Sequence, residues 1–456
     1  MPMKLVFPNG QEVKNSPYQG QHKRQISPAA FWFRKRRNMF NDIKTKICSK
    51  CGKELPIDQF RLYTFNGHQR YGNKCRMCEE AKRQQKHYDS FLEVYKSDPS
   101  MQVQRMIKKI APWRVLNKSS LGIKGVTRDE RFVKLLYYKD SWISSYGRII
   151  QKDNDGEYHL LGGKYCNGEL TYTLDYNVYF KTRKEWGYRR KKVRACDLVI
   201  QTFIVNYDIK NNICCWHTNN DTKDNYYKHL YPVNEKQYAV ILERHKSEGE
   251  VSEKQIMEII NIPEYKPEGW NPWYFRHSYE GVGYIGGRAE LHSEVCLRWQ
   301  NMIQRCYNKA VHRLKPYYKG IKVCEEWKNF QNFKVWYDEH MIPGASLDLD
   351  KDLLGQKQGI YSPETCVLVS HYINTVFEDR GVKECIKKNE DGQYNVSMTF
   401  LNKTEKVGIF DTKEEASDAF KKFRRNYIRE LAEKSRGKVP DCVYNAMMEW
   451  KIEITD

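Results

Sequence analysis

The sequence predicts a multidomain protein of the α+β class, and three observations lead to that prediction. A chain of 456 residues exceeds what one hydrophobic core usually supports, which favours about three domains. Two CxxC pairs, with 23 residues between them, are typical of a small metal-bound unit. Beyond them, stretches that alternate apolar and polar residues predict hairpins, and apolar residues at helical spacing predict helices.

The charge balance points to a polyanionic partner. Lysine and arginine number 78 against 57 acidic residues, a net charge of +21, so nucleic acid bound in a salt-dependent manner is the leading candidate. Aromatic residues make up 13% of the chain, which suits base stacking as well as ordinary cores. No apolar run is long enough to cross a membrane, and the N-terminus MPMKLVFPNGQEVKN lacks a secretion signal. We therefore expect a soluble intracellular protein with no membrane partner.

Residues 1–46 are predicted to form a basic N-terminal arm. They hold few periodic apolar positions and include FWFRKRRNMF, in which three consecutive rings precede four cations. Such an arm can contact phosphates, and a solvated charge run is the alternative.

The cysteines of the two CxxC pairs predict a structural zinc site. They are Cys48, Cys51, Cys75 and Cys78. Each CxxC turn can direct two thiolates at one ion, and a tetrahedral zinc site supplies folding energy that a small module lacks. Four unrelated buried cysteines are the alternative. We assign residues 47–115 to this zinc-binding unit and to a basic helical connector after it.

Residues 116–243 are predicted to contain a hairpin and a polar site. YYKDSWISSYGRIIQKDNDGEYHLL alternates around Gly147 and an Asp-Gly turn, as expected for a hairpin. In RRKKVRACDLVIQTFI, which comes next, a basic stretch is followed directly by a segment predicted to form an amphipathic helix or strand. CCWHTNNDTKDNYYKHL follows and contains His217, Asn225 and His229. Residues 244–280 are predicted to form a linker that holds one helix near 255–260.

Residues 281–380 are predicted to form a unit with core-facing helices. Apolar residues recur there at helical spacing: Trp299, Met302, Ile303, Cys306, Phe330, Phe333 and Trp336. Such stripes are typical of core packing. LDLDKDLL supplies Asp348, Asp350 and Asp352 on a predicted strand, for which an exposed acidic turn is the alternative.

Residues 381–456 are predicted to form a sheet backed by a helix. Three short strand-like pieces, CIKK, YNVSMTFL and EKVGIF, precede DTKEEASDAFKKFRRNYIRELAEK. Thr412 and Glu415 make a capping box at the start of that helix. The order predicts a three-stranded sheet and one helix.

Several of these segments resemble known phage proteins. YYKDSWISSYGRII, KKVRACDLVIQTFI and WHTNNDTKDNYYKHLYPVNEKQ, in that order, resemble the HNH homing endonucleases of phages. Residues 281–456 resemble phage HNH-type proteins with a C-terminal ethylene-response-factor (Apetala-type) DNA-binding domain, through GVGY, RWQNMIQRCY, YYKGIKVCEEW, LDKDLLGQKQGIYSPETCVLVSHYIN, GIFDTKEEASDAF and VYNAMMEWKIEITD. The zinc pairs resemble an N-terminal element common in such phage proteins.

The resemblance implies two ββα-metal (HNH-like) units, over 116–243 and 281–380, and an Apetala-type domain over 381–456. It implies a site-specific homing endonuclease that hydrolyses double-stranded DNA with Mg²⁺ or Mn²⁺. It also implies a location in the cytoplasm of the host bacterial cell during phage infection.

In the first unit the resemblance assigns His217 as the general base and Asn225 as the residue that orders the turn. It places His229 on a helix, where Asn225 and His229 would share one face. Relatives carry metal ligands at the positions where this chain has Trp216 and Tyr238.

In the second unit the resemblance assigns the Mg²⁺ ligands to Asp350, Asp352 and Asn374, which offer the oxygen atoms that this ion prefers. Lys351 stands at the base position, where a solvated lysine is a poor base. His371 is the nearby imidazole that could serve instead.

The remaining assignments are DNA contacts. Tyr146 and Arg148 of the hairpin are candidate groove contacts. The basic stretch is predicted to neutralise phosphates through Arg189, Arg190, Lys191 and Lys192. In the C-terminal domain the candidates are Lys387, Lys388, Tyr394, Lys403, Lys406, Arg424 and Arg425. Which of them contact bases stays open, because base and phosphate contacts use the same residue types.

Two other functions stay open at the level of sequence. Trp216, Tyr238 and Lys351 favour a catalytically degenerate protein of the same scaffold, which acts as a DNA-binding regulator or as a subunit of a phage nucleic-acid complex. RNA binding through the zinc unit and the aromatic residues is the third interpretation. RNA and other phage proteins therefore stay open as partners.

Overall fold

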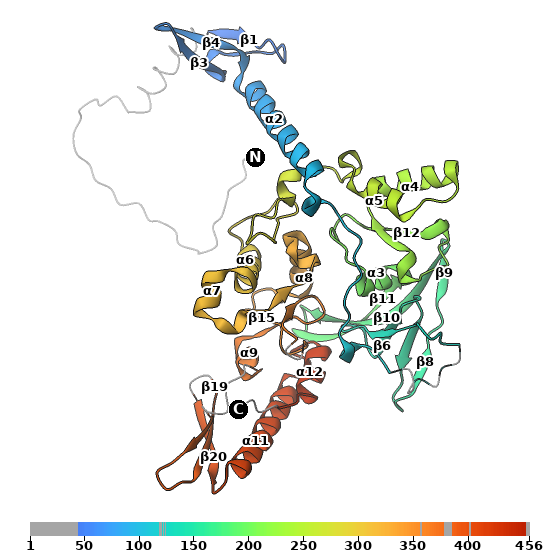
Figure 1. The fold of residues 1–456 in the computed structure, drawn as a ribbon, viewed down its shortest axis with the longest axis vertical. Coiled ribbons are helices and arrows are strands. Elements are labelled where there is room, and N and C mark those ends of the chain that lie inside the picture. The colour runs from blue at the N-terminus through green and yellow to red at the C-terminus, as the bar shows by residue number, and fades with distance from the viewer. Residues whose placement is uncertain are drawn as a thin grey trace, which may run out of the picture. The chain divides into compact units, whose positions relative to one another are not determined.

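Figure 1 shows a computed structural model of the chain, which describes residues 44–452 except 118–120, 122, 124, 356–357, 378–384 and 401–402. Residues 1–43 of the predicted basic arm lie outside the described residues. The chain divides into two compact units, Met1–Asp89 and Ser90–Asp456. The described residues mix helices and strands, in agreement with the predicted class. No helix among them is both long and apolar enough to cross a membrane.

The N-terminal unit is built from two β-hairpins and the first part of a long helix. Its elements are β1 (Thr45–Ile47), β2 (Glu54–Pro56), β3 (Phe60–Phe65), β4 (His68–Cys75) and the start of α2 (Arg76–Ser97). β1 pairs with β2 and β3 pairs with β4, both antiparallel. The buried cluster of this unit consists of Cys48, Phe60 and Cys75. Because that core is so small, the unit needs a further source of stability.

The larger unit opens with two antiparallel sheets and a helix. The elements are β5 (Phe132–Lys134), β6 (Ser141–Ser144), β7 (Ile149–Lys152), β8 (Tyr158–Leu160), β9 (Lys164–Cys166), β10 (Glu169–Phe180), β11 (Glu185–Arg194) and α3 (Ala195–Phe203). β5 to β8 form one sheet in chain order, and β10 lies between β9 and β11 in the other. The predicted hairpin is present as β6 and β7. The sequence predicts that RRKKVRACDLVIQTFI forms a basic stretch followed by an amphipathic helix or strand. In the structure the basic stretch belongs to the strand β11, and the apolar part forms the helix α3.

A strand–strand–helix arrangement follows α3. Its elements are β12 (Cys214–His217), β13 (Leu230–Val233), α4 (Glu235–Glu248) and α5 (Glu253–Asn261). β12 and β13 are antiparallel. Both helices begin with a capping box, in which an Asn or Ser side chain and a Gln side chain satisfy each other's main-chain N–H groups.

The helix predicted near 255–260 is confirmed by α5, which lies inside the segment 244–280 that the sequence predicts as a linker. Ile256, Ile259 and Ile260 of α5 are buried in one cluster with Trp216. Their i, i+3, i+4 spacing gives the short helix one apolar face, which packs against β12 and β13 instead of staying in solvent.

A second strand–strand–helix arrangement lies further along the chain. The elements are α6 (Glu294–Tyr307), α7 (Lys309–Leu314), β14 (Lys322–Val323), α8 (Phe330–His340), β15 (Leu347–Asp350), β16 (Ile360–Tyr361), β17 (Val367–Ser370) and α9 (His371–Phe377). β15 pairs antiparallel with β17, and α9 continues directly from β17. The predicted stripes of α6 and α8 lie in the core, as expected.

The predicted three-stranded sheet backed by one helix is confirmed in the C-terminal part. The elements are β18 (Ile386–Lys388), β19 (Tyr394–Phe400), β20 (Lys403–Phe410), α11 (Lys413–Ser435) and α12 (Asp441–Met448). β19 lies between β18 and β20, all antiparallel. Thr412 and Glu415 form the predicted capping box. Ala416, Phe420 and Ile428 of α11 are buried with Val396 and Met398 of β19.

Residues 98–115 form a strap of extended backbone with 3₁₀ turns at Pro99–Met101 and Pro112–Arg114. The α-helical connector predicted to reach residue 115 is therefore wrong in its second half. α2 ends at Ser97. Ile107 forms a β-bridge with Ile204, and the N–H of Val103 donates to Oδ1 of Asn261 at 2.8 Å. These contacts take the place of intrahelical hydrogen bonds, so the segment binds across α3 and α5.

Candidate functional site

The four predicted zinc ligands come together in the N-terminal unit. The ligand atoms of Cys48, Cys51, Cys75 and Cys78 all lie within 4.8 Å of one another. The first pair lies in the turn between β1 and β2, and the second pair joins the end of β4 to the first turn of α2. In the first turn, the N–H of Gly52 donates to the carbonyl of Cys48 at 2.9 Å, which closes the loop around the thiols. The cluster could hold a tetrahedral zinc ion.

Main-chain N–H groups favour the thiolate form of Cys48. The N–H groups of Cys75 and Lys50 donate to its Sγ at 3.3 and 3.4 Å. These hydrogen bonds, that of Cys75 foremost, lower the pKa of Cys48 to about 6. A hydrogen bond with Cys75 raises the pKa of the Cys78 thiol to about 12. Zinc binding would draw off that proton, because the ion takes thiolates as ligands.

His217 lies on the face of β12 that is turned toward α3. Successive strand residues alternate between faces, so Cys215 and His217 share one face and Trp216 occupies the other. His217 is only 3% exposed. This burial contradicts its predicted role as general base, because a phosphodiester has no access to the ring.

Aromatic rings fill the space between β12 and α4, where the resemblance implies metal ligands. The rings of Trp216 and Tyr238 meet edge to face with centroids 5.6 Å apart, and the ring of His245 lies 5.7 Å from Trp216. A hard cation requires oxygen ligands. The first strand–strand–helix arrangement is therefore unsuited to Mg²⁺.

Asn225 and His229 do not share a helix face, so that part of the prediction is wrong. Asn225 is buried in the loop before β13, where its Nδ2 donates to the carbonyl of Lys223 at 3.3 Å. His229 ends a 3₁₀ turn (Tyr227–His229), and its Nδ1 lies 2.5 Å from Oδ2 of Asp224. Asp224 also accepts from the N–H of Tyr226 at 3.0 Å. This side-chain turn competes with helix formation.

Asn225 does pack against the hairpin turn, as its predicted ordering role requires. Gly147, at φ +79°, lies so close that a Cβ added there would stand 2.5 Å from the Cβ of Asn225. Only glycine meets both the left-handed backbone and this close approach.

In the second strand–strand–helix arrangement, the helix α9 lies beside the strand β15 (Figure 1). The side chains of Asp348, His371 and Asn374 come together there. Nδ1 of His371 lies 2.7 Å from Oδ2 of Asp348, and Nδ2 of Asn374 lies 3.4 Å from the same oxygen. The side chain of His371 is 69% exposed and that of Asp348 is 35% exposed. A carboxylate, an imidazole and an amide are thus grouped at a position open to solvent.

The predicted Mg²⁺ ligands Asp350 and Asp352 are used elsewhere, which contradicts that assignment. Oδ1 of Asp350 accepts from the N–H groups of Asp352 and Leu353 at 3.0 and 2.7 Å, and Asp350 is 6% exposed. Asp352 lies beyond the end of β15 and forms an ion pair with Lys351 at 2.6 Å. Because α9 begins where β17 ends, its first turn lies beside Asp348, which is two residues, or about 6.6 Å, from Asp350 along the strand.

Asparagine at position 350 is expected to stabilise the fold at neutral pH. Burial raises the pKa of Asp350 to about 6, above the value of about 3.9 in an unfolded chain. The stability that this group contributes is thus present below about pH 4 and is lost as pH rises through about 6. Asp350→Asn keeps the acceptor and removes the charge, so urea unfolding should show a gain of about 1 to 3 kcal/mol at pH 7. At pH 4 the difference should nearly vanish, and a loss of stability at pH 7 would contradict this reasoning.

The predicted groove contacts of the hairpin have partners inside the protein. The hydroxyl of Tyr146 donates to Asp129 at 2.6 Å, and its ring stacks on that of Tyr226 with centroids 4.5 Å apart. Arg148 forms a two-pronged contact with Glu130, whose side chain is 1% exposed. Loss of Arg148 would leave a buried carboxylate unpaired, so its geometry indicates a structural role.

The basic stretch predicted to neutralise phosphates forms the exposed middle of β11. Arg189, Arg190, Lys191 and Lys192 are all exposed. Strand alternation sends two of these cations to each face of the β10–β11 ribbon. Nζ of Lys191 lies 4.3 Å from the centroid of the Tyr176 ring, and Nζ of Lys192 lies 3.0 Å from Sγ of Cys166.

The C-terminal sheet has one face covered by α11 and one face open. The pairings Lys387–Asn395 and Ser397–Lys406 place Lys387 and Lys406 on the open face, in agreement with a contact role. Tyr394 instead packs against the core on the helix side. Lys388 pairs with Tyr394 and lies beside its ring at 5.7 Å, on that same side. The side chain of Lys403 lies outside what the structure describes.

Arg424 is buried, which contradicts its predicted contact with DNA. It is 7% exposed, and its Nη2 donates to the carbonyl of Val376 at 3.2 Å. Arg425, one residue on, is exposed. Adjacent helix residues point about 100° apart, so only one of the two can face solvent fully.

The chain was compared with family models, curated proteins and solved structures. No family model, no curated protein and no solved structure matches it. The geometry of its own side chains therefore carries the functional argument.

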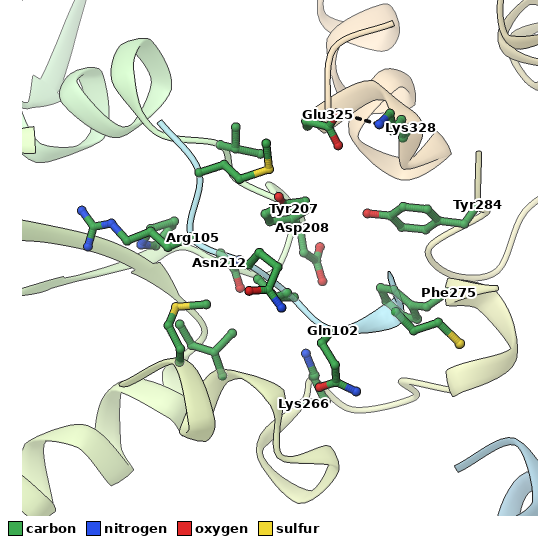
Figure 2. A pocket seen from close by; sticks show the side chains of 18 of the residues that line it. Gln102, Arg105, Tyr207, Asp208, Asn212, Lys266, Phe275, Tyr284, Glu325 and Lys328 are labelled. Carbon is green, nitrogen blue, oxygen red and sulfur yellow. Dashed lines mark hydrogen bonds and ion pairs between the residues drawn. The ribbon is translucent and has the colours of Figure 1, made fainter. Parts of the chain in front are cut away.

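A cavity of about 280 Å³ lies beside the strap, away from the residues just described. Figure 2 shows Lys266, Asp208 and Gln102 directed into it. Burial lowers the pKa of Lys266 to about 8, against the opposing charge of Asp208. Nζ of Lys266 lies 5.7 and 5.9 Å from the ring centroids of Tyr95 and Trp270. This buried cation lies beside two aromatic rings and within the electrostatic influence of one carboxylate, in a segment that the sequence predicts as linker.

Two sets of residues escaped the sequence-based site assignments. The alternation of LDLDKDLL places Asp348 and Asp350 on one strand face, and only the start of α9 decides which of them meets Asn374. Cys196 and Cys215 carry no recognisable ligand spacing, yet they lie next to His217. Neither set has a local signal that singles it out.

Proposed function

We propose that the protein binds double-stranded DNA and hydrolyses its phosphodiester bonds with a divalent metal ion at the unit formed by β15, β17 and α9. The observation that carries this proposal is the convergence of Asp348, His371 and Asn374 at a solvent-exposed position. The strand–strand–helix order of this unit agrees with the expectation of an HNH-like unit, and Asp348 takes the place predicted for Asp350.

The residues present fit Mg²⁺ or Mn²⁺. Asp348 offers a carboxylate, and Asn374 offers an amide oxygen once its side-chain amide is turned over, so two hard oxygen donors come from facing elements. Mg²⁺ usually takes one or two protein carboxylates or carbonyls and fills its other positions with water and phosphate. Bound there, the ion would stabilise the negative charge that develops on the scissile phosphate.

The chain's own residues supply the proton chemistry. Asp348 accepts from Nδ1 of His371, which favours the tautomer whose Nε2 can accept a proton from water. Because His371 is largely exposed, a DNA backbone can approach it. Lys351, at the predicted base position, is held by Asp352 with its side chain only 11% exposed, so His371 is the better base.

Exposed cations support DNA as the substrate. The chain carries a net charge of +21, and the cations of β11 and the open face of the C-terminal sheet are accessible. Such groups contact phosphates without selecting sequence and make affinity fall with salt. Several surfaces that each bind DNA weakly would together bind it more tightly, because their attachment to one chain raises the effective concentration of each surface once another is bound.

Replacement of Asp348, Asn374 or His371 by alanine is expected to lower Mg²⁺-dependent nicking of duplex DNA by about 10² to 10⁴-fold. Nicking of supercoiled plasmid measured with Mg²⁺, Mn²⁺ or EDTA tests this, with DNA affinity measured in parallel and expected to change little. Asp338→Ala is the matched control, because Asp338 is an exposed carboxylate paired with Lys334 on α8. Unaltered nicking in all three variants would exclude this site.

A second candidate is a DNA-binding protein without nuclease activity. The observation that favours it is the ring pair Trp216–Tyr238, which fills the first arrangement. This candidate would be supported if the wild-type protein binds duplex DNA in a steeply salt-dependent manner but does not cleave it in the presence of any divalent ion tested. Competition between DNA and RNA probes in the same assay would separate it from RNA binding.

A further inference from the structure

Three buried side chains outside the zinc cluster bring ligand atoms together. Cys196, Cys215 and His217 each offer one ligand atom, and these atoms lie within 4.8 Å of one another. The three residues are 2%, 4% and 3% exposed. Among the described residues, this is the second of two groups close enough to share a metal ion, the first being the four cysteines of the N-terminal unit.

Secondary structure explains why these side chains meet. Cys215 and His217 lie two residues apart on β12 and therefore project from the same strand face. Cys196 lies in the first turn of α3, which packs on that face in a common core with Cys215 and Leu230. The cluster thus joins α3 to the β12–β13 hairpin (Figure 1).

The imidazole of His217 points to a missing partner. Its Nε2 is buried and, within the described part of the chain, has no hydrogen-bond partner. Buried polar groups in folded proteins are normally satisfied. Two neighbouring thiols are weak hydrogen-bonding groups, whereas thiolate and imidazole are the ligands that zinc prefers.

We propose that Cys196, Cys215 and His217 bind a Zn²⁺ ion that fixes α3 to β12. Two thiolates and a neutral imidazole balance the charge of a divalent ion, which suits a buried site, whereas Cu⁺ with the same ligands would leave a net negative charge in the core. The three side chains leave one position of a tetrahedral ion for water or another donor.

Metal content of the full-length protein tests the proposal. Protein purified under reducing conditions should hold two zinc ions per chain by inductively coupled plasma mass spectrometry, one for each cluster. The double variant Cys196→Ser/Cys215→Ser should hold one, and Cys51→Ser, in the N-terminal unit, should independently lose the other. Cys366→Ser is the matched control, because Cys366 is fully buried and belongs to neither cluster; it should keep both ions.

X-ray absorption at the zinc edge of the wild-type protein gives a second readout that does not depend on how the variants fold. Six thiolates shared by two ions predict an average of three sulfur ligands per zinc, with imidazole scattering. One zinc per chain with four sulfur ligands and no imidazole signal would overturn the proposal. So would copper in place of the second zinc, or a mass decrease that shows Cys196 and Cys215 joined as a disulfide.

Discussion

Replacement of Cys48 by serine is expected to release one zinc ion per chain and to unfold the N-terminal unit. Zinc binding by such a cluster contributes about 10 to 16 kcal/mol, whereas the buried cluster of this unit, within residues 44–89, consists of Cys48, Phe60 and Cys75. Without the ion, the two hairpins have too little apolar burial to offset the conformational entropy of the chain.

Limited proteolysis with peptide mapping measures this effect. Residues 44–89 should become protease-sensitive in Cys48→Ser, while residues 90–456 keep their thermal transition. Cys166→Ser is the control, because Cys166 lies outside the zinc cluster. A Cys48→Ser protein that keeps its full zinc content and its protease resistance would show that the unit does not depend on the metal.

Replacement of Lys108 by methionine is expected to destabilise the larger unit by about 3 to 5 kcal/mol, because it leaves buried carboxylates without their cation. Nζ of Lys108 lies 2.7 Å from Glu326 and 3.3 Å from Glu364, and the three side chains are 13%, 4% and 21% exposed. Glu326 also accepts from the N–H of Asn206 at 2.9 Å, so the ion pairs tie the strap, the end of α3 and the segment before α8 together.

The loss of stability in Lys108→Met should depend on pH. Burial raises the pKa of Glu326, and removal of the lysine would raise it further. The cost of Lys108→Met should therefore be greatest at neutral pH and should shrink as pH falls and the carboxyls become protonated. Urea unfolding at pH 7 and pH 4.5 would measure this.

Two controls separate charge from packing in the Lys108→Met experiment. Glu326→Gln added to Lys108→Met should recover part of the loss, because the glutamine keeps an acceptor for the N–H of Asn206. Lys109→Met, at the exposed neighbouring position, should change stability by less than about 0.5 kcal/mol. Equal losses in Lys108→Met and Lys109→Met would contradict the importance of the buried pairs.

Two of the candidate sites differ in how far sequence alone could define them. The four clustered cysteines that could hold zinc were predictable, because CxxC turns are local and each brings two thiols together. The proposed hydrolytic site was predictable only in part. The aspartate-rich strand of the second unit and Asn374 were found, but Asp348 and not Asp350 lies beside Asn374, because that contact depends on where α9 begins relative to β15.

The sequence by itself determined the local structure of this protein. Gly147 set the hairpin turn, Thr412 and Glu415 set the start of α11, and the apolar stripes of α6 and α8 set their core faces. These features depend on residues a few positions apart, whose main-chain and side-chain preferences act before any tertiary contact forms.

Only the tertiary structure decided which polar and aromatic side chains are accessible to solvent and which are buried in contacts within the protein. It buried His217 beside two cysteines, turned Trp216 onto Tyr238, and paired Lys108 with Glu326. Apart from the contact of His217 with Cys215 on its own strand, these contacts join residues from different elements, many of them far apart in the chain. Their geometry depends on how elements pack against each other, and neither spacing nor periodicity along the chain records that packing.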